Sequence, residues 1–171
     1  MKRTVLRIFA FVILALAAPA AGEDIGGWQE AKWGMTPDEV QKVLSYPTSV
    51  ADLAKVCREP CNEGTALELD DYDLNGQHFI VRLWFGKPDM RLQAVSMYAK
   101  QLDKDNGNQA FTKIKNFLET VYGSPKSVTL KHPDFVIKWV LQSTTITLYS
   151  NTTDQMTLVY EGRTDHESGK S

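Results

Sequence analysis

The side chains with the most distinctive chemistry in this chain are two cysteines, Cys57 and Cys61, in the segment Cys-Arg-Glu-Pro-Cys. In an oxidising compartment, cysteines this close together form a small local disulfide. Two thiolates at this spacing can instead hold a soft ion such as Cu(I). No histidine in a recognisable ligand pattern and no thioredoxin-like alternation of strands and helices accompanies the pair. The disulfide is therefore favoured, and closing so short a loop stabilises the fold by roughly 2 kcal/mol.

An acidic cluster lies beside a predicted hairpin and contains Glu68, Asp70, Asp71 and Asp73. Such a cluster can hold a hard cation, because Ca²⁺ takes several oxygen ligands. The segment lacks the loop glycine and the terminal glutamate of an EF-hand, and strand alternation sends neighbouring side chains to opposite faces. We interpret the cluster as the solvated end of a strand and expect no metal site.

Catalytic motifs are missing from the sequence. His132 precedes Pro133 in a predicted turn, where an imidazole can act as an acid or a base. However, no serine or cysteine occupies a nucleophile motif, and neither Gly-x-Ser-x-Gly nor His-Glu-x-x-His occurs. Because no nucleophile, base and orienting group can be assembled from the spacing, the sequence predicts a protein that is not an enzyme and needs no cofactor.

The first residues of the chain have the order of a secretory signal peptide. A basic start is followed by an apolar run over 8–18 and then by small residues up to Ala21. The run is shorter than the roughly 20 residues that a helix needs to span a bilayer. We therefore predict a signal peptide over 1–21, cleaved after Ala20 or Ala21, and a periplasmic or secreted protein without a membrane anchor.

Composition narrows the class of partner. About 150 residues remain after cleavage, enough for a single domain that buries roughly 70% of its unfolded surface. The full chain carries 19 basic and 21 acidic residues, and removal of the signal peptide takes away three of the basic ones. A mildly acidic protein is a poor match for nucleic acid, which requires a clustered basic surface.

Capping signals and periodicity predict two main helices. Thr36 is typical of an N-cap, Pro37 of a first helical residue, and Glu39 completes a capping box. The second helix spans about 108–122, where apolar residues recur at helical spacing and a glycine follows as C-cap. Apolar spacing also predicts a further short helix over 48–57.

Strands are predicted where the apolar period changes from about 3.6 to 2. Asn75-Gly76 between two alternating runs is a strong signal for a two-residue hairpin. The predicted strands are 67–74, 79–85, 92–98, 135–141, 146–148 and 156–160. The order is then helix, three strands, helix, three strands, which predicts an α+β fold with two helices on one face of an antiparallel sheet.

An internal similarity indicates a tandem repeat of a helix-plus-meander unit. At an offset of 78 residues, four positions near the ends of the two helices match, namely Val43, Pro47, Ser49 and Val50 with Val121, Pro125, Ser127 and Val128. We predict a single α+β domain over 22–160, with half-repeats at about 28–100 and 106–160. The remaining residues, 161–171, are predicted to form a disordered polar tail.

The start of the first helix carries a motif made of Gly34, Met35, Thr36, Val40, Leu44 and Pro47. It resembles the Gly-Met-Thr-x3-Val-x3-Leu-Gly-x-Pro signature of the SmpA/OmlA family of outer-membrane assembly lipoproteins. Ser45 replaces the family's glycine, and the family's lipid-bearing cysteine has no counterpart. The doubled layout is similar to that of secreted β-lactamase inhibitor proteins, in which two helix-plus-sheet repeats form a concave binding sheet. Both resemblances imply a small exported module that binds other proteins.

One predicted strand face is more apolar and aromatic than a solvent-facing surface should be. The partner-binding residues predicted on it are Ile80, Arg82, Trp84, Tyr98, Lys138 and Tyr149. Tyrosine, tryptophan and arginine dominate binding hot spots. The sequence leaves open whether this face binds a partner or is covered permanently, by helices or by a second copy in a homodimer.

The favoured function is an exported, non-catalytic binding module that engages a protein or peptide on the open face of its sheet. The alternative is a periplasmic thiol or copper-handling protein that uses Cys57 and Cys61. Their spacing resembles that of the Sco family of copper-delivery proteins.

Overall fold

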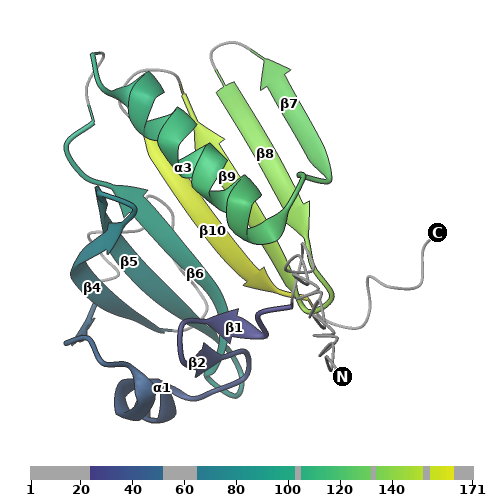
Figure 1. Ribbon diagram of the computed structural model, residues 1–171. Helices are drawn as coiled ribbons and strands as arrows, with labels where there is room; N and C mark the ends of the chain where they lie inside the picture. The colour runs from purple at the N-terminus through teal and green to yellow at the C-terminus, as the bar shows by residue number, and fades with distance from the viewer. Residues whose placement is uncertain (1–23, 52–64, 103–104, 132–133, 152–154, 164–171) are drawn as a thin grey trace, which may run out of the picture.

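The structure is a computed structural model that describes residues 24–51, 65–102, 105–131, 134–151 and 155–163 (Figure 1). The predicted signal peptide over 1–21, the two cysteines Cys57 and Cys61, and His132 lie outside the described residues. Within the described ranges, no helix combines the length and the apolar character needed to cross a membrane.

The fold is α+β, as predicted, and consists mainly of one eight-stranded antiparallel sheet. Its strands are β3 (Ser49–Val50), β4 (Thr65–Leu74), β5 (Gln77–Gly86), β6 (Arg91–Ala99), β7 (Ser127–Lys131), β8 (Asp134–Val140), β9 (Thr144–Ser150) and β10 (Met156–Gly162). A small two-stranded sheet of β1 (Gly27–Trp28) and β2 (Ala31–Lys32) precedes the first helix. The two helices are α1 (Pro37–Val43) and α3 (Gly107–Tyr122).

Helix α1 begins with the predicted capping box. The Thr36 hydroxyl accepts a hydrogen bond from the Glu39 backbone N–H at 3.4 Å, and the Thr36 N–H donates to Glu39 Oε2 at 2.8 Å. The hydrogen bond from the Thr36 backbone is the main reason that the pKa of Glu39 is lowered. Val40 on this helix is fully buried, so the short helix is held by its cap and by one core side chain.

Helix α3 lies along one face of the half of the sheet that β7 to β10 form (Figure 1). It buries Ile114 and Leu118 completely, and each such side chain contributes about 1.5–3 kcal/mol when it leaves water. The helix ends at Gly123, whose φ of 78° lies in a region that glycine adopts without steric cost. Both helices contribute to a single core cluster, together with the inward side chains of the sheet.

The predicted hairpin between β4 and β5 is confirmed. Asn75 and Gly76 both have positive φ, 53° and 75°, as the central residues of a type I′ turn require. Leu74 and Gln77 pair on either side of the turn. Along β5, buried and partly exposed residues then alternate without a break.

The sheet is arranged symmetrically about its centre. Its strand order is β3-β4-β5-β6-β10-β9-β8-β7, so each half contributes a helix and four strands, and the last strands of the halves, β6 and β10, pair antiparallel. One cross-strand row contains Ser49, Glu68, Arg82, Ser96, Val159, Thr147, Lys138 and Ser127. Its two ends, Ser49 and Ser127, are a pair that the 78-residue offset matches.

Two boundaries differ from the prediction. Ser49–Val50 is the edge strand β3 rather than the start of a short helix, because its backbone pairs with Glu68 and Leu67 on β4; residues 52–57 lie outside the described ranges. The ordered domain also continues past 160. Glu161 pairs with β6 and β9, and the Arg163 N–H donates to the Ser143 carbonyl at 2.8 Å.

Candidate binding face

All six predicted partner-binding residues lie on the face of the sheet opposite the helices, which we call the open face. Five of the six lie in two neighbouring cross-strand rows of this face. The first row contains Ile80, Tyr98, Thr157, Tyr149 and Val136. The second row contains Arg82, Ser96, Val159, Thr147 and Lys138. Trp84 stands in the next row, where it pairs with Ala94. Residues far apart in the sequence are thus brought into one continuous surface by the strand register.

The open face differs in exposure from the face that the helices cover. On β5, the inward residues Phe79, Val81 and Leu83 are fully buried, whereas the intervening Ile80 and Trp84 remain partly exposed. On β8 and β9, Val140 and Tyr149 are 41% and 43% exposed. Both described helices pack on the other face, so large apolar side chains of the open face remain in contact with solvent.

On the β4–β6 side of the open face, polar groups are already paired within the protein. Arg82 donates from Nε to Glu68 Oε2 at 2.7 Å, and its guanidinium carbon lies 4.8 Å from the centre of the Tyr98 ring. The Trp84 indole N–H donates to the Ser96 hydroxyl at 3.2 Å. A partner therefore meets apolar and aromatic surface here, held in place by internal contacts, rather than free hydrogen-bonding groups.

On the β8–β9 side, the side chains of Lys138 and Thr147 have no polar partner among the described residues. Lys138 is exposed and has no ion pair within the described ranges. Thr147, its cross-strand neighbour, is only 2% exposed, and its hydroxyl has no hydrogen-bond partner among the described residues. The Thr147 hydroxyl is shielded from solvent, so of these two groups only Lys138 can reach a partner.

The acidic cluster lies toward the C-terminal end of β4, where its carboxylates lie close to basic side chains. Asp71 lies 3.0 Å from His78 Nδ1 and 3.6 Å from Lys100 Nζ, and Asp70 lies 3.8 Å from Lys100 Nζ. A register shift between Leu69 and Tyr72 places Asp70 and Asp71 at an irregularity of the strand, which interrupts the alternation expected there. Each carboxylate thus faces a basic side chain, and no group of three potential metal ligands occurs in the described part of the chain.

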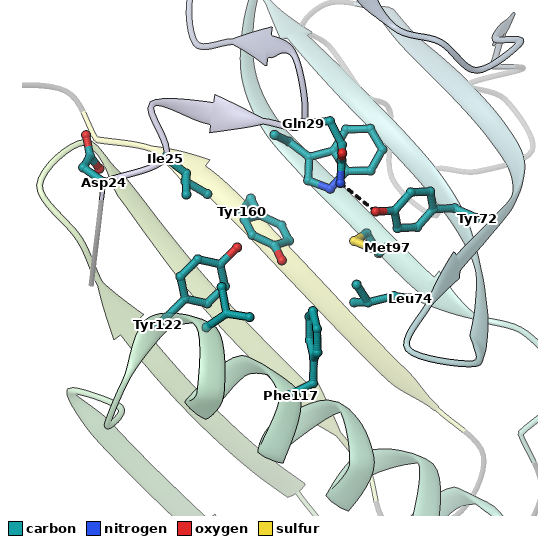
Figure 2. Close-up of a pocket in the computed structure, with 11 residues that line it drawn as sticks. Asp24, Ile25, Gln29, Tyr72, Leu74, Met97, Phe117, Tyr122 and Tyr160 are labelled. Atoms are coloured by element: carbon teal, nitrogen blue, oxygen red, sulfur yellow. Dashed lines mark hydrogen bonds between the residues drawn. The ribbon is translucent and has the colours of Figure 1, made fainter. Parts of the chain in front are cut away.

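A cavity on the helix side of the sheet is a second candidate site, which the sequence did not indicate (Figure 2). It has a volume of about 540 Å³ and lies between α3, the turn after β1, and strands β4, β6 and β10. Tyr72, Tyr122 and Tyr160 line it, and each comes from a different element. No local motif marks these tyrosines, because only the tertiary fold brings them together.

Comparisons with protein-family models, with curated proteins and with solved structures gave no significant match. The function must therefore be derived from the geometry of the open face and of the cavity.

Proposed function

We propose that this protein is an exported, non-catalytic binding module that holds a protein or peptide segment against its open face. The observation that carries the proposal is the exposure of Ile80, Trp84, Tyr98 and Tyr149 on one continuous surface that neither described helix covers. Covering such a surface is favourable by about 25 cal/mol per Å² of apolar area. The aromatic side chains are also of the types that carry most of the energy at interfaces.

Lys138 on β8 defines the chemistry of the partner. Its ammonium group is exposed and has no ion pair among the described residues. A carboxylate is the group that accepts a charge-assisted hydrogen bond from an ammonium group. The partner is therefore a segment with an acidic side chain between apolar ones, the acidic group lying at Lys138 and the apolar groups over Tyr149 and Tyr98.

Two resemblances support the same class of function. The helix-start motif is similar to that of the SmpA/OmlA family, and the doubled helix-plus-strands layout is similar to that of the secreted β-lactamase inhibitor proteins. The symmetric strand order is the arrangement that a duplicated unit would produce. These likenesses favour a protein-binding module over an enzyme.

A photo-crosslinking amino acid at Tyr149 tests the proposal directly. We expect p-benzoylphenylalanine at this position to give one discrete heavier adduct when the protein is exported by its host cells. Lys138→Glu should reduce the yield of the adduct at least about fivefold, because it replaces the attraction for a carboxylate by repulsion.

Matched controls lie away from the open face. Tyr46 is 40% exposed, close to the exposure of Tyr149, and packs against Tyr72 on the helix side. The crosslinker at Tyr46 should give no adduct, and Lys113→Glu on α3 should leave the Tyr149 adduct unchanged. Equal adducts from both positions, or none from Tyr149, would contradict the proposal. An adduct of two copies of this chain would replace it with a homodimer.

Export is part of the proposal and has a separate test. Processing after Ala20 or Ala21 predicts a mature N-terminus that mass spectrometry of the exported protein will identify. The same sample should contain no free thiol, because Cys57 and Cys61 are expected to be bonded in an oxidising compartment. Two free thiols or a bound copper ion would instead favour the thiol or copper-handling alternative.

A further inference from the structure

The cavity on the helix side of the sheet is large enough for a small molecule. Its volume of about 540 Å³ falls within the 300–1,000 Å³ that is typical of ligand sites. The described side chains that line it are Asp24, Ile25, Trp28, Gln29, Tyr72, Leu74, Met97, Phe117, Val121, Tyr122 and Tyr160. Most of these residues are apolar or aromatic, and polar atoms of Asp24, Gln29 and the three tyrosines share the lining with them.

Three of the polar groups are phenol hydroxyls, which lie on two sides of the cavity. Figure 2 shows the hydroxyls of Tyr122 and Tyr160 close together, with the hydroxyl of Tyr72 pointing toward the cavity from the opposite wall. Tyr72 accepts a hydrogen bond from the Gln29 amide nitrogen at 2.7 Å, which leaves its own proton available for a ligand.

Burial makes ionisation of these phenols still less favourable than in water. It raises the pKa of Tyr72 to about 12, and it also raises the pKa of Tyr122 and, well above its usual range, that of Tyr160. At neutral pH all three are therefore neutral groups that can donate a hydrogen bond to an oxygen atom.

The described lining offers no counter-charge to an anionic ligand. None of the described residues that line the cavity is basic. Asp24 supplies a carboxylate, and both of its oxygens accept hydrogen bonds from Ser143, one from the backbone N–H at 2.8 Å and one from the hydroxyl at 2.6 Å. An anionic ligand would therefore be placed beside a carboxylate and away from any basic side chain of the lining, which is unfavourable.

We propose that this cavity binds an uncharged, largely apolar molecule that presents a carbonyl oxygen to the Tyr72 and Tyr122 hydroxyls. The apolar body of the ligand lies against Met97, Leu74 and Phe117. This site is separate from the open face, because the sheet lies between them. Its test is therefore independent of the proposed partner.

A fluorescent naphthyl ketone, 6-propionyl-2-dimethylaminonaphthalene, is a suitable probe because it is uncharged and carries one carbonyl. We expect its emission to shift to the blue on titration with the protein, in a saturable manner. Tyr72→Phe should weaken its binding roughly 3- to 10-fold, which corresponds to the loss of one hydrogen bond. N-phenyl-1-naphthylamine, which has no carbonyl, should bind Tyr72→Phe and the original protein equally.

Occlusion of the cavity gives a second readout. Val121 lines the cavity yet is 45% exposed, so it lies at the rim. Val121→Trp should weaken binding of the ketone more than about tenfold. Val128→Trp on β7 is the control, because Val128 is 49% exposed but does not line the cavity.

The proposal is overturned if the ketone does not bind, or if it binds Val121→Trp and the original protein equally. Stronger binding of the anionic 1-anilinonaphthalene-8-sulfonate would overturn the assignment of an uncharged ligand.

Discussion

Arg82 and Lys138 lie in the same cross-strand row of the open face but have different roles. The side chain of Arg82 is 16% exposed, forms an ion pair with Glu68 and makes a cation–π contact with the ring of Tyr98. Lys138 is exposed and has no ion pair in the described part of the protein. We therefore assign Arg82 to the support of the aromatic surface, and Lys138 to the recognition of a partner.

Arg82→Ala should destabilise the protein by about 1–2 kcal/mol. The change leaves Glu68, 25% exposed in its side chain, without its partner, and it removes the cation–π contact with Tyr98. Urea unfolding measures the free-energy difference. Arg91→Ala is the control. Arg91 is half exposed, lies 3.9 Å from Glu39 and donates to the Gly34 carbonyl at 3.0 Å, so the loss of these exposed contacts should cost less than about 1 kcal/mol. Equal effects of the two substitutions would contradict this role of Arg82.

Tyr72 should make stability fall at alkaline pH. Its pKa is about 12 in the folded protein and about 10 when unfolded, so the unfolded chain releases the proton first as the pH rises. The contribution of Tyr72 is therefore complete below pH 10 and is lost between about pH 10 and pH 12. Urea unfolding at about pH 8 and at about pH 11 measures how far the free energy of unfolding falls between the two. This fall should be about 1 kcal/mol smaller in Tyr72→Phe than in the original protein. Tyr149→Phe, which removes an exposed hydroxyl, should leave the fall unchanged.

At the scale of elements, the capping box of α1 is a clear case of local determination. Its hydrogen bonds join residues only three positions apart, so Thr36, Pro37 and Glu39 specify the start of the helix by themselves. Thr36→Ala should cost about 1 kcal/mol of stability, measured by thermal or urea unfolding. The exposed Thr112→Ala within α3 is the matched control and should change stability by less than about 0.5 kcal/mol. If Thr36→Ala leaves the stability unchanged, α1 is held by Val40 and the core alone.

Elements fixed by local signals could be predicted, and those fixed by pairing could not. The hairpin at Asn75-Gly76 and the C-terminal end of α3 follow from turn and cap residues. The apolar spacing around Ser49–Val50 predicts a helix, but pairing with β4 makes this segment an edge strand. The open face could be predicted from alternation, whereas the tyrosine-lined cavity depends on elements that meet only in the folded chain.

At the scale of the whole molecule, the two halves depend on each other. Strands β6 and β10 pair across the centre of the sheet, and the inward side chains of both halves belong to one core cluster. The symmetric order of the strands also places the two edges of the sheet, β3 and β7, at equivalent positions of the two halves. A shared core of this kind predicts that neither half unfolds without the other.

Unfolding should therefore be a single cooperative transition. Leu83 in the first half and Leu148 in the second are both fully buried, and truncating either to alanine should cost about 2–5 kcal/mol. Because the core is shared, both substitutions should lower the midpoint of the same transition, with tryptophan fluorescence and circular dichroism giving coincident curves. Independent halves would behave differently, since Leu83→Ala would split the curve and leave the later part at its original midpoint. That result would mean that the pairing of β6 with β10 joins two separate folding units.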